Sequence, residues 1–216
     1  MRTTLLLSAL LAPTSIAAAQ IQFPAEPDQK LLPTFSAPFN FGWDIHMDGE
    51  RAVIGGRTGF AEVFERQPDG LWTPEALLLP PDGVDPSSFG WTVATSGDYA
   101  LVGAFDADAT GINDGAAFVY ERADDGAWTL AAELTRDIVG INLASDFGIA
   151  LDLQGEVAIV GQPGGESSDP GTPFGFGGEV YVFERSDDGT WPQTAKLTAS
   201  DAESSADFGT SVAFDD

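Results

Sequence analysis

The sequence predicts an all-β fold, a β-propeller-type array of four-stranded antiparallel blades. Three observations predict it. A Phe-Gly dipeptide begins four copies of one repeat, whose starts lie 48, 58 and 61 residues apart. Within each copy, apolar runs of about four to eight residues alternate with Gly or Asp-Gly turns, a pattern typical of strands and hairpins. No stretch after the first 19 residues keeps a helical period.

The repeat contains four predicted strands in a fixed order, named a, b, c and d. Strand a follows each Phe-Gly and ends at a turn on Gly49, Gly97 or Gly155. Strand b reads RAVIGG, YALVGA or VAIVGQ, and strand c reads GFAEVFER, GAAFVYER or GEVYVFER. A PDG or DDG turn then leads to a Trp and to strand d. One such sheet cannot bury both of its faces, so the copies are expected to pack on one another.

The recurring aromatic residues are predicted to be structural, because they keep a fixed register in every copy. The Phe side chains are expected between neighbouring sheets, and the Gly residues are expected to let strand a start close to the central axis. Each Trp is expected to anchor an outer strand, and the Glu-Arg pair that ends strand c is expected either to join neighbouring copies or to cap the edge of the sheet. The signature residues are Phe41, Gly42, Phe89, Gly90, Phe147, Gly148, Phe208, Gly209, Trp72, Trp128 and Trp191.

The first 19 residues have the pattern of a secretory signal peptide. Arg2 precedes the apolar run LLLSALLA, and SIAAAQ offers a small-residue cleavage site after Ala19. The apolar run is far shorter than the roughly 20 residues that cross a bilayer. The rest of the chain is therefore expected to be secreted, periplasmic or at the cell surface, with no transmembrane segment.

The remaining residues, 20–216, are expected to form one propeller region. Full blades are expected at about 41–79, 89–134 and 147–197, with an isolated strand d at about 29–34 and an isolated strand a at 208–216. This is fewer than the roughly four to eight blades of closed propellers. We therefore expect an N-terminal fragment of a longer protein; the alternative is an open array with an unpaired edge.

The charge balance excludes several classes of partner and chemistry. The chain has 34 acidic and 9 basic residues, a formal net charge of −25, and no Cys. Such a charge repels nucleic acids and anionic membrane surfaces. The lack of Cys excludes disulfides, Cys metal sites and Cys nucleophiles.

The order of these motifs resembles the bacterial FG-GAP repeat, which is similar to the repeats of the integrin alpha-subunit β-propeller. The resemblance rests on FG, then the VGA-type strand b, GAAFVY, DGxW and AKLTASD before the next FG, over about residues 29–216. It implies a propeller of typically seven blades with a binding rather than a catalytic role. Integrin blades carry an Asp-rich calcium loop between their first two strands, whereas these copies have only MDGE, TSGD or LQGE there. The resemblance therefore does not extend to those calcium sites.

The ligand face is predicted at the end of the sheets where the b-c and d-a loops lie. These loops vary in length and sequence between copies, and variable loops on a rigid scaffold commonly carry recognition. The ligand-face candidates are Asp106, Asp108, Asn113, Asp114, Phe174 and Phe176. The run DADATGIND begins like a calcium loop, with Asp106, Asp108 and Asp114 as candidate ligands, but Thr110 and Ala117 break the pattern. A solvated acidic turn is the alternative there, and PGGESSDPGTPFGFG is either a ligand loop or a simple insertion.

The residue inventory favours binding over catalysis. His46 is the only histidine, which excludes His-containing triads and multi-His metal sites, and no catalytic residue or cofactor is assigned. The predicted function is an adhesion-type module for an extracellular protein or glycan. Two alternatives stay open: a carbohydrate-active or other hydrolase that uses a carboxylate pair on the same face, and a purely structural segment of a larger surface protein.

Overall fold

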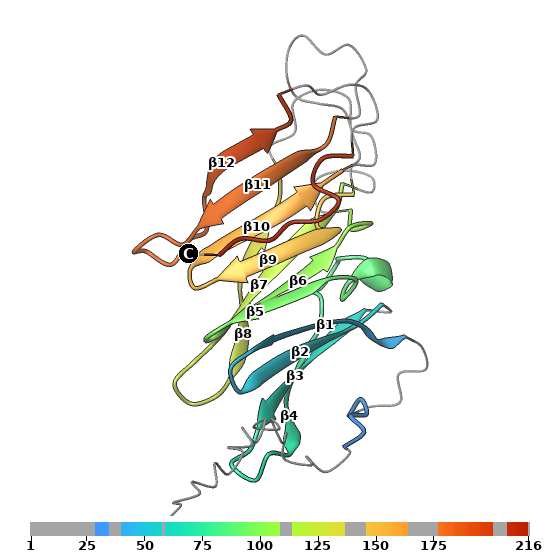
Figure 1. The fold of residues 1–216 in the computed structure, drawn as a ribbon, viewed down its shortest axis with the longest axis vertical. Helices are drawn as coiled ribbons and strands as arrows, with labels where there is room; N and C mark the ends of the chain where they lie inside the picture. Colours follow the sequence, from blue (N-terminus) through green and yellow to red (C-terminus); the bar gives the residue numbers. More distant parts are fainter. Residues whose placement is uncertain are drawn as a thin grey trace, which may run out of the picture.

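The computed structural model describes residues 29–34, 40–57, 59–108, 114–136, 146–163, 177–200 and 207–215. These residues form three four-stranded antiparallel sheets that follow one another along the long axis of the molecule (Figure 1). The predicted all-β class and the four-stranded antiparallel blade are therefore confirmed. The described residues include no helix with the length and apolarity of a membrane span.

Each sheet holds four strands in chain order, so every strand pairs with the next one along the sequence. The first sheet contains β1 (Phe41–Asp48), β2 (Arg51–Gly56), β3 (Phe60–Arg66) and β4 (Trp72–Leu78). The second contains β5 (Val93–Ser96), β6 (Tyr99–Ala104), β7 (Ala116–Arg122) and β8 (Trp128–Leu134), preceded by the 3-10 turn η1 (Pro86–Ser88). The third contains β9 (Ala150–Gln154), β10 (Val157–Gln162), β11 (Glu179–Glu184) and β12 (Gln193–Thr198).

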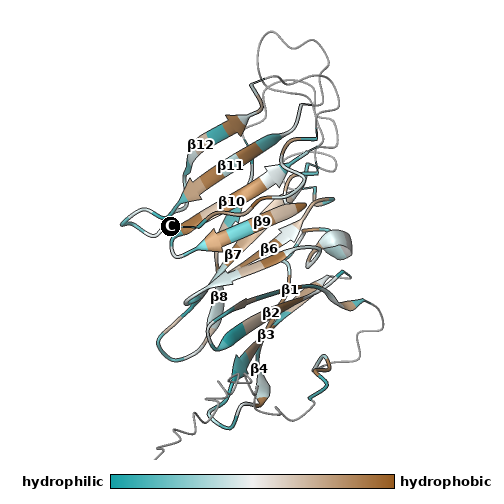
Figure 2. Ribbon diagram, in the orientation of Figure 1, coloured by the Kyte–Doolittle hydropathy of each residue, from teal (hydrophilic) through white to brown (hydrophobic). Residues whose placement is uncertain are grey.

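The hydrophobic core lies between the sheets rather than inside any one of them. Val53 and Leu78 of the first sheet pack in one cluster with Phe89 and Phe118 of the second. Leu134 of the second sheet packs likewise with aromatic residues of the third. Apolar residues accordingly run along strands such as β10 and β11 (Figure 2). Each sheet thus depends on its neighbour to cover its apolar face.

The Phe-Gly dipeptides form the joints between sheets. Phe89 and Phe147 are fully buried. Isolated parallel bridges join Phe147 to Gly115 and Phe208 to Gly178, and the Gly59 amide donates to the Phe89 carbonyl at 3.2 Å. The dipeptide of one copy therefore meets the start of strand c in the copy before it.

Polar side chains on β1 cover the edge of the neighbouring strand β5. Asp44 Oδ2, His46 Nδ1 and Asp48 Oδ2 accept the amide N–H groups of Val93, Thr95 and Gly97 at 2.8, 3.1 and 2.8 Å. At the next two junctions, Ser96 Oγ accepts from the Gly155 amide at 3.0 Å, and Asp152 Oδ2 accepts from the Phe214 amide at 2.7 Å. These bonds satisfy edge-strand donors that would otherwise be unpaired.

The isolated strands expected at 29–34 and 208–216 are not strands in the structure, up to Asp215. A strand needs a partner in its ladder, and among the described residues neither segment forms a ladder with the strands near it, since 208–215 has only the isolated Phe208–Gly178 bridge. Gln29 instead exchanges two hydrogen bonds with the Trp72 backbone, at 2.6 and 2.7 Å, and Leu31 packs on the outer face of the first sheet. Packing of Leu31 thus replaces the expected pairing.

Candidate functional site

Three aromatic rings gather at the end of the molecule that carries the b-c and d-a loops. Trp43 lies at the start of β1, Trp91 lies just before β5, and Phe105 follows β6. The ring centroids of Trp43 and Trp91 are 4.8 Å apart, and those of Trp91 and Phe105 are 4.7 Å apart. Trp43 is 46% exposed, so this cluster presents an indole to solvent.

Arg57 completes the cluster from the loop that follows β2. Its guanidinium carbon lies 4.8 Å from the Trp43 ring centroid and 4.5 Å from that of Trp91, which is cation-π geometry. The other described arginines pair with carboxylates: Arg51, Arg66, Arg122, Arg136 and Arg185. Arg57, by contrast, makes no ion pair with any described residue, so two indoles hold an exposed guanidinium.

Asp106 directly follows Phe105 in the chain and adds a carboxylate near Arg57. Its amide donates to Ser88 Oγ at 2.8 Å, which anchors the loop to η1. Burial raises the pKa of the Asp106 carboxyl, the carboxylates of Asp146 and Asp85 raise it further, and Arg57 lowers it. We call Trp43, Arg57, Trp91, Phe105 and Asp106 the aromatic platform.

The other predicted site residues have different surroundings. Asp114 is fully buried and forms an ion pair with Arg136 at 3.4 Å, where the side chains are 0% and 8% exposed. Asp108 is exposed. Asn113, Phe174 and Phe176 lie outside the described residues. The structure therefore places Asp106 in the platform and Asp114 in a buried ion pair below the loops.

The described residues do not assemble a calcium site of the predicted kind. Within the described ranges, no group of three or more His, Asp or Glu side chains could hold a metal ion. The run DADATGIND lies partly outside those ranges, since residues 109–113 are not described. Calcium at Asp106, Asp108 and Asp114 stays a prediction.

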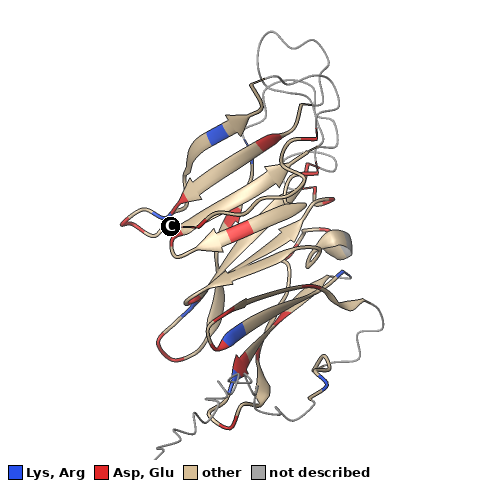
Figure 3. Cartoon of the chain, in the orientation of Figure 1, with Lys and Arg blue, Asp and Glu red and all other residues tan. Residues whose placement is uncertain are grey.

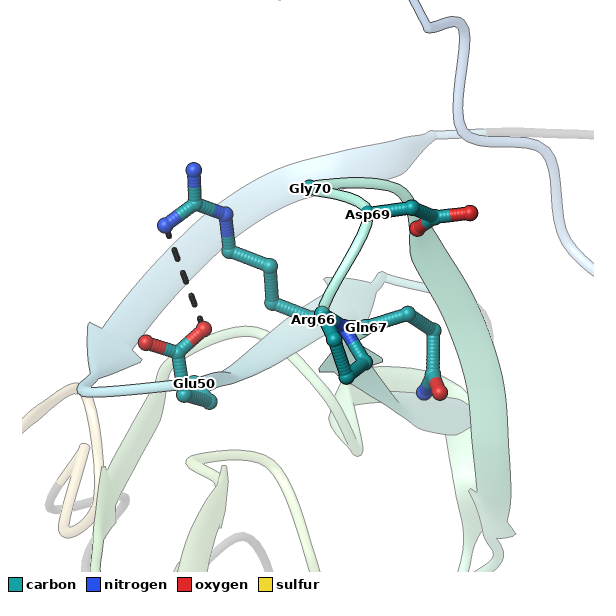
Figure 4. A pocket seen from close by; sticks show the side chains of 6 residues that line it. Glu50, Arg66, Gln67, Asp69 and Gly70 are labelled. Carbon is teal, nitrogen blue, oxygen red and sulfur yellow. Dashed lines mark ion pairs between the residues drawn. The ribbon is translucent and has the colours of Figure 1, made fainter.

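The opposite end of the molecule carries an open hollow of about 490 Å³, lined by Glu50, Arg66, Gln67, Pro68, Asp69 and Gly70 (Figure 4). In it, Arg66 lies 3.9 Å from the Glu50 carboxylate. The corresponding pairs in the other sheets are Arg122 with Asp98 at 4.0 Å and Arg185 with Glu156 at 3.1 Å. Because every sheet repeats this contact, the hollow belongs to the turn structure and is not a separate site.

The Glu-Arg pairs at the end of strand c also join neighbouring sheets. Arg122 bonds Glu75 of the first sheet, and Arg185 lies 3.7 Å from Glu121 of the second. The predicted pairing between copies is therefore confirmed at both junctions. Acidic residues are frequent at the turns of this end (Figure 3).

Sequence reasoning missed four members of the platform, Trp43, Arg57, Trp91 and Phe105. One signal was available. The first two copies read FGW, whereas the third and fourth read FGI and FGT at the same place. An aromatic residue that departs from its repeat is free of the structural role that the repeat imposes, so it is a candidate for function.

Comparison with known proteins finds a similar repeat over part of the chain. The family model of the FG-GAP repeat matches residues 72–120 and 191–216. This match confirms the resemblance inferred from the motifs. No curated protein matches the chain at a significant level.

Several solved structures are similar in fold at low sequence identity. A protein from Lactobacillus plantarum has a TM-score of 0.49 and 17% identity, over 73% of this chain and 42% of that one. A chain of a mitotic checkpoint complex has a TM-score of 0.48 and 14% identity, over 92% and 49%. Sqt1 from Saccharomyces cerevisiae has a TM-score of 0.47 and 10% identity, over 76% and 37%. The chain thus spans less than half of the length of each of them.

Proposed function

We propose that this chain, which matches the FG-GAP repeat over residues 72–120 and 191–216, is an exported binding module that recognises a protein or glycan through its variable-loop end and performs no catalysis of its own. The observation that carries this proposal is the aromatic platform. Exposed aromatic and arginine side chains are enriched where proteins bind partners. The platform also lies on the face that the loop pattern predicts for recognition.

The platform is suited to binding because its parts are held before any ligand arrives. The rings of Trp43, Trp91 and Phe105 contact one another in sequence, and Arg57 lies over two of them. A side chain that is already ordered loses little conformational entropy when a partner binds. The two polar groups, Arg57 and Asp106, add hydrogen-bond donors and acceptors that fix orientation.

The proposal is tested by screening the full chain against arrays of extracellular proteins and glycans. The double variant Trp43→Ala, Trp91→Ala should lose at least about tenfold in affinity for the partner found, because interface aromatics commonly contribute more than about 1.4 kcal/mol. Leu71→Ala is the matched control, since Leu71 is an exposed apolar residue at the opposite end. Binding that is lost in the control and kept in the double variant would place recognition at the tight turns instead.

One observation favours the hydrolase alternative. Burial raises the pKa of Asp106, the carboxylates of Asp146 and Asp85 raise it further, and a raised pKa is one property that a general acid needs. Turnover of a glycan on the same arrays, lost in Asp106→Asn, would establish this activity. Binding without product release would support the binding module.

A further inference from the structure

We propose that the aromatic platform binds a neutral saccharide. This inference rests on the proposed function and names the class of ligand. The platform offers three kinds of contact at once: an exposed indole of Trp43, the N–H donors of Arg57 and the carboxylate of Asp106. A neutral sugar ring has an apolar C–H face and hydroxyl groups that both donate and accept. It is the class of ligand that matches all three.

A cationic ligand group fits poorly because its place is already taken. Arg57 lies over both indoles, at 4.8 Å from Trp43 and 4.5 Å from Trp91. A lysine or arginine of a partner would have to displace this guanidinium or lie next to a like charge. The aromatic contact that would recognise a cation is therefore made internally.

An anionic ligand group fits poorly for the opposite reason. Asp85 and Asp146 each raise the pKa of Asp106, so three carboxylates act on the loop end near Arg57. The formal net charge of the chain is −25. One guanidinium does not outweigh this field, so a polyanion approaching the loop end meets repulsion.

A neutral polyol avoids both penalties and uses both polar groups. Its hydroxyls can accept hydrogen bonds from Arg57 and donate hydrogen bonds to Asp106. Its C–H face can pack on the exposed part of the Trp43 indole, which is a large apolar surface with limited rotational freedom. Recognition by a few convergent polar groups around an aromatic wall is typical of small-ligand sites.

The test measures binding of defined probes to the full chain by calorimetry and tryptophan fluorescence. The neutral probes are the hexasaccharides of cellulose, laminarin, mannan and chitin. The charged probes are hexagalacturonate and a Gly-Arg-Gly-Arg-Gly peptide. We expect at least one neutral hexasaccharide to bind at least about tenfold more tightly than either charged probe, a difference of about 1.4 kcal/mol.

Variants assign that binding to the platform. Trp43→Ala should weaken it at least about tenfold, whereas Trp43→Phe should keep most of it. Arg57→Gln leaves the rings in place and should weaken it about threefold to tenfold by removing charged donors. Ile45→Ala is the matched control, because Ile45 is 54% exposed on the same strand and lies outside the platform; it should leave the affinity within about twofold.

Failure of the inference and failure of the proposed function give different results. If only hexagalacturonate or the peptide binds, and Trp43→Ala abolishes it, the neutral class is wrong and the loop-end binding module stands. If a neutral sugar binds equally to wild type, Trp43→Ala and Arg57→Gln, the platform is not its site. If neither these probes nor any protein or glycan on the arrays binds at the loop end, both proposals fall.

Discussion

Glycine in the Phe-Gly dipeptide is required for two separate reasons. Gly90 has φ of 87°, a left-handed conformation that residues with a side chain rarely adopt. A Cβ at Gly90 would also lie 2.1 Å from the Phe60 carbonyl oxygen of the preceding sheet. Gly42 shares the backbone conformation, with φ of 83°, but a Cβ there would meet nothing within 4 Å. The same residue type thus meets a backbone requirement within β1 at one place, and a backbone requirement plus a close sheet contact at the other.

The two effects can be separated by a matched pair of substitutions. Gly42→Ala should cost about 1–2 kcal/mol from backbone strain alone. Gly90→Ala should cost about 1–3 kcal/mol more, because the backbone of the first sheet must move away from the new methyl group. Urea unfolding followed by circular dichroism measures the difference, and equal losses in the two variants would show that close approach of the sheets contributes nothing.

At the scale of secondary-structure elements, side chains of strand a join neighbouring sheets by accepting backbone hydrogen bonds from the next copy. In β1, His46 accepts the Thr95 amide of β5, and in β9, Asp152 accepts the Phe214 amide of the next copy. His46 and Asp152 occupy the same position of the repeat, because each lies five residues after the Phe of its own Phe-Gly dipeptide. Two chemically different acceptors therefore perform one structural role.

This equivalence predicts how position 46 tolerates substitution. His46→Ala should lower the free energy of unfolding by about 1–3 kcal/mol, because Thr95 is 1% exposed and its amide would lose its acceptor. His46→Asp should stay near wild type, since the third sheet uses Asp in the same contact. Thermal unfolding of both variants, with Met47→Ala as an exposed control on the same strand, checks this. If His46→Asp were as unstable as His46→Ala, the shared acceptor role of positions 46 and 152 would be contradicted.

At the scale of the whole molecule, charge pairs tie the first sheet to the second. Glu75 bonds Arg122 of β7 and lies 3.3 Å from Arg51 of β2, while Arg51 also lies 3.2 Å from Asp98. The Glu75 side chain is 11% exposed, so solvent screens this cluster less than it screens a surface pair. The cluster therefore adds ion pairs to the apolar interface between the first and second sheets.

Removing the Glu75 carboxylate tests whether these ion pairs stabilise the contact between the sheets. Glu75→Gln should lower the free energy of unfolding by about 1 kcal/mol, since it leaves two guanidinium groups facing a neutral amide. Glu50→Gln should change the free energy of unfolding by less than about 0.5 kcal/mol, because the Glu50 side chain is 66% exposed and its ion pair with Arg66 is long, at 3.9 Å. Denaturation at low and high salt should show the Glu75 effect shrinking with salt. Equal, salt-independent effects in the two variants would rule the cluster out as a tie between sheets.

The order of strands could be predicted because it depends on local chemistry. Gly49, Gly97 and Gly155 have φ of 56°, 56° and 55°, and such residues mark the hairpin turn between strands a and b in every copy. The alternating apolar runs between these turns then leave little choice but neighbouring antiparallel strands. The described residues 29–34 and 208–215 form no ladder because a strand is a property of a pair, and the sequence of one segment does not show whether another strand pairs with it.

The sequence by itself determined the fold class, the repeat and the end of the sheets where loops vary, because turn residues and side-chain alternation act over a few residues. Only the tertiary structure decided which of those residues meet. Trp43, Arg57, Trp91 and Phe105 come from two sheets and become neighbours through the packing of one sheet on the next. The same packing brings Asp106 of the second sheet near Arg57 of the first, whereas the pairing of β7 with β8 brings Asp114 to Arg136 within the second sheet. Contacts between distant segments depend on the angle and spacing of packed sheets, which no local pattern records.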